Sequence, residues 1–171
     1  IKRKSERVKG KNFKKINYKP LYKFLLDKLK KCKFTEIYVD TDSNEIKNYC
    51  KKLNYKIINR LPSLAKKNAN GNDLLNYHLK VIDAEIYFQL FVTAPLLKVS
   101  TINKCISILK RNKKYDSILT SKSIYSWFWF GKKPVNYDPK ILPRSQDAKP
   151  LVLETTGLYG IRKAALKKLI T

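Results

Sequence analysis

Four stretches of the chain repeat apolar residues every three or four positions, the spacing that places them on one face of an α-helix. The four stripes are Leu21, Phe24, Leu25 and Leu29; Ile46, Tyr49, Cys50 and Leu53; Leu74, Leu75, His78, Leu79 and Ile82; and Ile102, Cys105, Ile106 and Leu109. A fifth helix is expected at 163–170. The one histidine, His78, lies among leucines, so we interpret it as a structural residue.

Shorter β-rich runs separate these helices. Strands are expected at 34–41, 55–59, 85–92 and 116–120, and the run EIYFQLFV at 85–92 is apolar enough for a strand buried on both faces. Alternating strands and helices predict a single α/β domain over 1–171, with three layers, a Rossmann-like fold and a mostly parallel sheet. The last third departs from the alternation, because 123–138 reads as a β-hairpin excursion that turns at Gly131.

Polar residues at the segment boundaries predict where helices begin. Pro20 would start the first helix, Asp42 and Glu45 would form a capping box for the second, Asn72 would cap the third, and Ser100 or Thr101 would open the fourth.

Length and composition exclude several classes of protein. A chain of 171 residues with periodic hydrophobic segments forms a real core, and no apolar run approaches the roughly 20 residues of a membrane span. No signal peptide opens the sequence, and its three cysteines form no CxxC pair. We therefore expect a cytoplasmic protein with reduced thiols.

The formal net charge of +25 attracts phosphate groups. Such a charge fits a nucleic-acid-binding protein, but the lysines are spread over the chain and arginine is scarce beside lysine. This spread favours a compositional habit over a dedicated nucleic-acid interface. The charge also suits a nucleoside triphosphate.

The basic segment 2–12 is the strongest candidate for binding a polyphosphate. It offers cationic side chains, the hydroxyl of Ser5 and the backbone N–H groups around Gly10, although the spacing is not that of a Walker loop. In open parallel sheets, ligands bind at the carboxyl ends of strands. We therefore expect this segment to lie beside the loops at 41–44 and 93–98.

The segment KRKSERVKGKN resembles the opening signature of the acylneuraminate (CMP-sialic acid) cytidylyltransferases. Four later segments are similar to that family in the same order: YVDTDSNEI, NRLPSLAKKNANGNDLL, FVTAPLL and RSQDAKPLVLETTGLYGIRK. The resemblance implies the nucleotide-diphospho-sugar transferase fold and the transfer of CMP from CTP to an acidic sugar, with release of pyrophosphate.

The same resemblance assigns roles to individual residues. Catalysis by charge stabilisation is implied for Lys11 and Arg7. Nucleotide binding is implied for Lys2, Ser5, Lys11, Asn12, Arg60, Gly71 and Asn72, and acceptor binding for Thr93, Pro95, Arg144, Gln146, Glu154, Thr156 and Tyr159. These roles require segment 2–12 and the segment from Arg144 to Tyr159 to meet in one cleft.

Each assignment has a simpler alternative. Lys2 and Lys11 could be solvated charges, Arg60 could cap a strand end, and Tyr159 could pack in the core. The aromatic run 127–130 could stack nucleic-acid bases, but the family's projecting hairpin contributes to its dimer. We therefore expect a homodimer and no nucleic-acid partner.

Several positions depart from the family pattern. Phe91, Ala94 and Leu97 replace the usual Gln, Ser and Arg, which leaves the acceptor sugar open. The family also implies Mg²⁺, but its closing Asp-x-Asp segment is not found here, and only Ile1 could belong to its opening strand. A record trimmed at both ends explains this most simply. The alternatives are a nucleotidyltransferase of other base specificity, a non-catalytic homologue and a basic nucleic-acid-binding protein.

Overall fold

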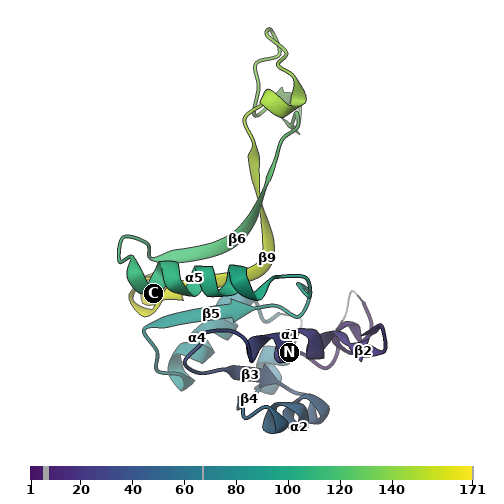
Figure 1. The fold of residues 1–171 in the computed structure, drawn as a ribbon, viewed down its shortest axis with the longest axis vertical. Coiled ribbons are helices and arrows are strands. Elements are labelled where there is room, and N and C mark those ends of the chain that lie inside the picture. The colour runs from purple at the N-terminus through teal and green to yellow at the C-terminus, as the bar shows by residue number, and fades with distance from the viewer. Residues whose placement is uncertain (6–7, 67, 171) are drawn as a thin grey trace.

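The computed structural model describes residues 1–5, 8–66 and 68–170. Figure 1 shows a body of helices and short sheets from which a long two-stranded arm projects. Both chain ends lie in the body. Among the described residues, no helix has the length and apolar character needed to cross a bilayer.

The N-terminal half is built on two parallel strands, β3 (Tyr38–Thr41) and β4 (Lys56–Asn59), joined by helix α2 (Asn44–Lys52). Helix α1 (Leu21–Leu29) and α2 pack their apolar faces against β3. The core there contains Ile46 and Cys50 of the second predicted stripe, so the helical periodicity is confirmed for α2. The first stripe is confirmed in part, because Leu25 and Leu29 are buried but so are Tyr22 and Leu26, which it did not include.

The C-terminal half is built on a three-stranded sheet in the order β5 (Ile86–Leu90), β9 (Leu151–Arg162) and β6 (Ser117–Ile124). Helix α5 (Val99–Arg111) covers one face, with Ile102, Cys105 and Ile106 packed against Leu158. Strand β9 pairs antiparallel with both of its neighbours.

The expectation of a mostly parallel sheet is therefore wrong, since only β3 and β4 pair in parallel among the described strands. The apolar run of β5 predicted a strand covered on both faces. Such a run does not reveal the direction of its neighbours, because burial of a strand's faces is independent of the direction of its partners. The neighbour of β5 is β9, which returns from the arm and enters the sheet between β5 and β6.

The remaining elements are short or lie at the edges. They are η1 (Lys11–Phe13), β1 (Lys15–Ile16), β2 (Lys19–Pro20), α3 (Pro62–Ala65), α4 (Gly71–Val81), β7 (Trp129–Phe130), β8 (Lys133–Pro134), η2 (Ser145–Asp147) and α6 (Lys163–Ile170). The expected hairpin is confirmed: β7 and β8 pair antiparallel across Gly131, whose φ of 59° lies in the left-handed region that suits glycine.

The arm ends in a small knob, residues 125–150, carried by the paired ends of β6 and β9 (Figure 1). The buried side chain of Asn136 links separate segments of the knob by hydrogen bonds. Its amide nitrogen donates to Ser126 O and to Lys149 O, both at 2.7 Å, and its oxygen accepts from Phe128 N at 2.9 Å.

The predicted starts of α2, α4 and α5 are wrong by one or two residues, whereas Pro20 starts α1 as predicted. Ser43, and not Asp42, caps α2, because its side chain accepts from Ile46 N. Asn70, and not Asn72, caps α4, where Asp73 completes a capping box. Pro20 is the N-cap of α1, and α5 begins at Val99 after Lys98. Several polar residues follow one another at these boundaries, so the pattern alone does not identify the residue that caps the helix.

Candidate active site

The basic segment near the N-terminus borders a cavity of about 830 Å³. The residues around this first cavity are Arg3, Lys4, Ser5, Lys9, Gly10, Phe13, Ser43, Asn44 and Glu45. The cavity therefore lies between the N-terminal loop and the first turn of α2.

Two hydrogen bonds hold the N-terminal loop against the end of β3, and a third closes the loop on itself. Arg3 N donates to Asp42 Oδ1 at 2.6 Å, Thr41 Oγ1 donates to Ile1 O at 2.7 Å, and Asn12 Nδ2 donates to Lys2 O at 2.8 Å. Asp42, which the sequence suggested as a cap, is instead an anchor for the loop. This anchoring places the basic segment at the carboxyl end of β3, where the sequence predicted it.

The first cavity is suited to an anion. Arg3, Lys4 and Lys9 border it, and the N-terminus of α2 adds the positive end of a helix dipole. Glu45, the bordering carboxylate among the described residues, accepts a 2.9 Å hydrogen bond from Tyr22 Oη. That bond engages one of its carboxylate oxygens.

Among the residues assigned to the nucleotide's phosphates, some border this cavity and others support the loop beside it. Ser5 borders the cavity, whereas the buried Asn12 supports the loop through its bond to Lys2 O. Lys11 lies in η1, directly after Gly10, and is not among the described bordering residues. Arg7 lies outside the residues that the structure describes. The catalytic roles of Lys11 and Arg7 remain predictions.

Arg60 lies in a buried charge cluster that sequence reasoning did not find. Its Nε is 2.8 Å from Asp40 Oδ1, and His78 Nε2 is 2.8 Å from Asp40 Oδ2. Burial raises the pKa of the Asp40 carboxyl, but hydrogen bonds from His78 and Arg60 and the charge of Arg60 outweigh burial and lower that pKa to about 2. Arg60 thus joins β4 to β3, and its assigned contact with the nucleotide remains a prediction.

Gly71 and Asn72 occupy the first turn of α4. The backbone N–H of Asn72 is already bonded to the Asn70 side chain at 2.8 Å. Neither residue is among the described residues that border the first cavity, and their nucleotide-binding role also remains a prediction.

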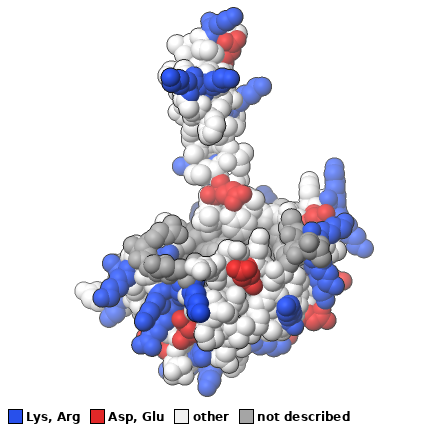
Figure 2. Space-filling view, turned by 180° about the vertical axis from the view of Figure 1, so that it is seen from behind, with Lys and Arg blue, Asp and Glu red and all other residues white. Residues whose placement is uncertain are grey.

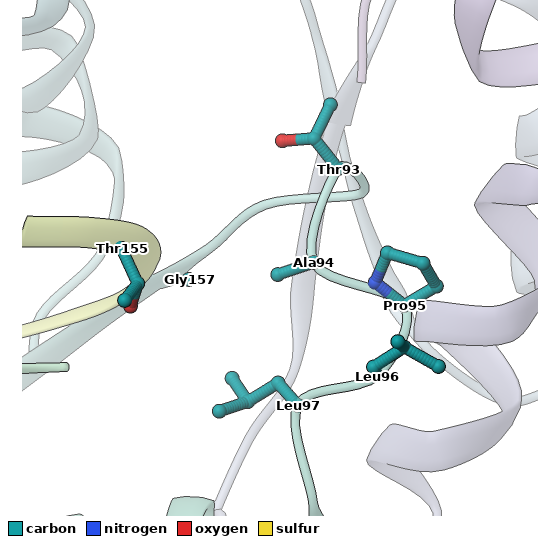
Figure 3. A pocket seen from close by; sticks show the side chains of 7 residues that line it. All are labelled: Thr93, Ala94, Pro95, Leu96, Leu97, Thr155 and Gly157. Atoms are coloured by element: carbon teal, nitrogen blue, oxygen red, sulfur yellow. The ribbon is translucent and has the colours of Figure 1, made fainter. Parts of the chain in front are cut away.

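A second, smaller cavity of about 300 Å³ lies between the loop after β5 and the base of the arm (Figure 3). The residues around it are Thr93, Ala94, Pro95, Leu96, Leu97, Thr155 and Gly157. Lys28 of α1 supports the loop from outside, since its Nζ donates to Pro95 O at 2.5 Å. Ala94, Pro95 and Leu97 make the lining of this cavity largely apolar.

The residues assigned to the acceptor do not share one place. Thr93 borders the second cavity, whereas Arg144 and Gln146 lie in the knob at the far end of the arm. Arg144 is paired there with Asp147 at 2.6 Å, and its side chain is 75% exposed.

Glu154 and Tyr159 face one another on β9. Tyr159 Oη donates to Glu154 Oε2 at 2.8 Å, and this bond raises the pKa of the Tyr159 hydroxyl. The Tyr159 ring also packs edge-on against Phe91, with 5.9 Å between ring centroids. Tyr159 therefore does not act by packing alone, because its hydroxyl is also bonded to Glu154. Its contact with the acceptor stays a prediction.

Arg144 and the basic loop do not meet in one cleft within a single chain. Among the described residues, the two cavities have no bordering residue in common, and Arg144 is carried away from both by the arm. The sequence could not show this, because the length by which β6 and β9 continue past the sheet depends on their pairing.

The described residues offer no group of three His, Cys, Asp or Glu side chains that could hold a metal ion. Asp42 and Glu45, two described carboxylates near the basic loop, already accept hydrogen bonds from Arg3 N and Tyr22 Oη. The described residues alone therefore form no site that fits the Mg²⁺ that the resemblance implies.

Lysine and arginine side chains are distributed over the body and also occur on the knob (Figure 2). This distribution agrees with the even spread in the sequence. The electrostatic attraction for phosphate is thus general, and the first cavity brings three of the cationic side chains together.

Three solved structures resemble this fold. CMP:2-keto-3-deoxy-manno-octonic acid synthetase, solved with CTP, superposes with a TM-score of 0.70 at 18% identity over 99% of this chain and 74% of that one. A cytidylyltransferase from Leptospira borgpetersenii gives 0.60 at 18% identity over 98% of this chain and 60% of that one. The 4-diphosphocytidyl-2C-methyl-D-erythritol synthase of Anaerococcus prevotii gives 0.61 at 16% identity over 93% and 71%.

At these identities the three structures establish the fold, which is that of the α/β nucleotide-diphospho-sugar transferases. The family follows from the sequence itself, since residues 3–127 match the cytidylyltransferase family. That match contains the whole basic segment from Arg3 onward and the loop after β5, and it covers well over half of the chain. The protein therefore belongs to the cytidylyltransferase family.

Proposed function

We propose that this protein transfers CMP from CTP to an acidic sugar of the acylneuraminate type. A hydroxyl oxygen of the sugar attacks the α-phosphorus of CTP, the bond to the β-phosphate breaks, and pyrophosphate leaves while the hydroxyl proton passes to solvent. The observation that carries the proposal is the first cavity, which combines three cationic side chains with the N-terminus of α2. Membership of the cytidylyltransferase family supports CTP as the nucleotide.

The triphosphate would occupy the first cavity, where Arg3, Lys4 and Lys9 neutralise the charge that develops as pyrophosphate leaves. Lys11 and Arg7, assigned by resemblance, would act on the same phosphates. Because no step requires a covalent enzyme intermediate, catalysis would rest on positioning and charge stabilisation.

The acceptor would bind beside the second cavity, near Thr93. Glu154 and Tyr159 lie on β9, the strand that supplies the opposite wall. The apolar lining contributed by Ala94, Pro95 and Leu97 supports an acceptor that differs from the sugar handled by family members with polar residues at these positions.

A nucleotide-binding experiment tests the proposal. We expect CTP to bind more tightly than ATP, GTP or UTP in isothermal titration calorimetry. The double variant Lys4→Gln/Lys9→Gln should weaken CTP binding by about tenfold or more, because each hydrogen bond to a charged phosphate contributes about 1.5–3 kcal/mol. The control Lys51→Gln/Lys52→Gln makes the same change in net charge at the other end of α2.

Equal binding of the four nucleotides would contradict the choice of CTP. An equal loss in both double variants would mean that the general charge of the protein, and not the first cavity, attracts the nucleotide. Formation of a CMP-sugar from labelled CTP and acylneuraminate is the matching activity assay, and the absence of any product would contradict the proposed reaction.

We also propose that the protein forms a homodimer through the arm. Trp129 and Phe130 are 57% and 84% exposed on the knob, an unusual position for large aromatic side chains. Since the knob carries Arg144 and Gln146, their assigned role in acceptor binding requires the cleft of a second copy.

Analytical ultracentrifugation tests this arrangement. The double variant Trp129→Ser/Phe130→Ser should shift the protein toward monomer, with dimer dissociation raised by at least about tenfold, as expected for central aromatic contacts. Tyr18→Ser is the matched control, because Tyr18 is 94% exposed but lies on the turn between β1 and β2. Sedimentation of the unchanged protein as a monomer at all concentrations would exclude the dimer.

A further inference from the structure

Strands β6 and β9 lose their register where the arm leaves the body. Leu119 pairs with Tyr159, but the next pair is Ser121 with Glu154, so the single residue Thr120 faces a longer segment of β9. Within that segment Thr156 has a φ of 48°. A β-branched residue rarely adopts this left-handed conformation, and strain of this kind persists only where surrounding contacts enforce it.

The contacts that enforce it converge on Thr120. Thr155 Oγ1 lies 2.9 Å from both Thr120 O and Thr120 Oγ1, and Leu158 N donates to Thr120 Oγ1 at 3.2 Å. One residue of β6 thus holds β9 on both sides of Thr156. We call the pair Thr120 and Thr155 the threonine clasp.

The threonine clasp lies against the second cavity. Thr155 and Gly157 form the wall that faces the loop of Thr93 to Leu97 (Figure 3). This wall is closely packed, because a Cβ built on Gly157 would lie 3.2 Å from Thr120 Oγ1 and 3.5 Å from Ala94 Cβ. Phe91 N also donates to Gly157 O at 3.4 Å, so a movement of β9 at this point changes the cavity and the loop together.

We propose that Thr120 is a positioning residue for the acceptor site: its hydroxyl fixes Thr155 and Gly157, and these fix the width of the second cavity. Thr120 itself does not border the cavity among the described residues, so it acts through β9. This inference rests on the proposed function for the identity of the ligand, but the geometry it describes is independent of that function.

Kinetics of hydroxyl-deleted variants test the inference. Thr120→Val keeps the shape of the side chain and removes the hydroxyl. We expect it to raise the KM for the acidic sugar by about tenfold, with CTP affinity unchanged, because small displacements of a binding wall have effects of this size or larger. Thr120→Ser restores the hydroxyl and should restore the KM, and Thr155→Val should resemble Thr120→Val. The control is Thr35→Val, which removes an exposed hydroxyl far along the chain.

Hydrogen exchange on the intact chain tests the geometry without turnover. In Thr120→Val we expect faster amide exchange in 91–97 and 154–158, while Thr35→Val exchanges like the unchanged protein. If the unchanged protein forms no CMP-sugar, the proposed function fails, and the exchange result still decides the inference. The inference about Thr120 would be overturned if Thr120→Val left amide exchange unchanged, or if it raised the KM of both substrates in parallel. Should Thr120→Val not fold, Thr155→Val and Thr120→Ser carry the same comparison.

Discussion

Replacing Asp40 by alanine is expected to lower the free energy of unfolding by about 3–5 kcal/mol. The carboxylate is buried between Arg60 and His78, and the side chain of Arg60 is only 10% exposed. Removing the carboxylate leaves the guanidinium inside the protein without its counter-ion, which costs more than the loss of the contact alone. Denaturant unfolding followed by circular dichroism measures the change.

The matched control is Asp83→Ala. Asp83 pairs with Lys163 at 2.5 Å, but its side chain is 91% exposed, and exposed ion pairs contribute little. Its unfolding midpoint should stay close to that of the unchanged protein. Equal destabilisation by the two variants would mean that the Asp40 cluster is not the buried interaction described above.

The same cluster makes the free energy of unfolding depend on pH in the acid range. The pKa of Asp40 is lowered to about 2, below its value in the unfolded chain, so its contribution is fully present above the unfolded pKa and is lost as pH falls through the folded pKa. A shift of this size corresponds to about 2.5 kcal/mol, lost between about pH 5 and pH 2. The difference in stability between the unchanged protein and Asp40→Asn should therefore shrink over that range. A difference that is constant with pH would contradict the lowered pKa.

Replacing Gly160 by valine is expected to cost about 3 kcal/mol, at the upper end of the usual range for overpacking. Gly160 lies in the middle strand β9, between Phe88 of β5 and Ile118 of β6. A Cβ at this position would lie 2.5 Å from Phe88 Cε1 and 2.9 Å from Ile118 Cγ2, so the ring of Phe88 fills the space above the glycine. Thermal and denaturant unfolding measure the loss.

Two further variants test whether overpacking at Gly160 causes the loss of stability. In Gly160→Ala/Phe88→Leu the smaller side chain makes room for the new methyl, so the double variant should lose less stability than the sum of the single variants. Gly71→Ala adds a methyl group where no atom lies within 4 Å, at the first turn of α4, and should be neutral or slightly stabilising. A well-tolerated Gly160→Val would show that β5 and β9 do not pack as closely as described.

The local pattern of the sequence was sufficient for most elements of the body. The helical stripes of α2 and α5 depend on burial of one face, and their buried residues are among those that the periodicity selects. In α1 the stripe is only partly right, because Tyr22 and Leu26 are buried and were not selected. The direction and position of β9 could not be predicted, because they depend on pairing between segments far apart in the chain. Neither its exposed arm half, which contains Leu151, Val152 and Leu153, nor its buried body half was among the strands expected from the sequence.

The candidate site was predictable only where one segment contains it. The basic loop offered its cations within a few consecutive residues, and the loop is indeed bound at the end of β3. The cluster of Asp40, Arg60 and His78 was missed because its members come from three elements and each has an ordinary local role. A polar residue closing the buried strand β3 and a histidine on an apolar stripe were the available signals. The placement of Arg144 on the arm required the three-dimensional structure.

The three hydrogen bonds of Asn136 have a consequence for the order of folding. Pairing of Ile124 with Leu151 must bring together two strands separated by the whole knob, and the entropy lost in closing such a loop rises with its length. Asn136 binds Ser126 and Lys149, which lie next to the two strand ends, through bonds that span only part of that distance. We therefore expect the knob to fold first and to hold the two strand ends together. Pairing of β6 with β9 should then proceed from the tip of the arm toward the body.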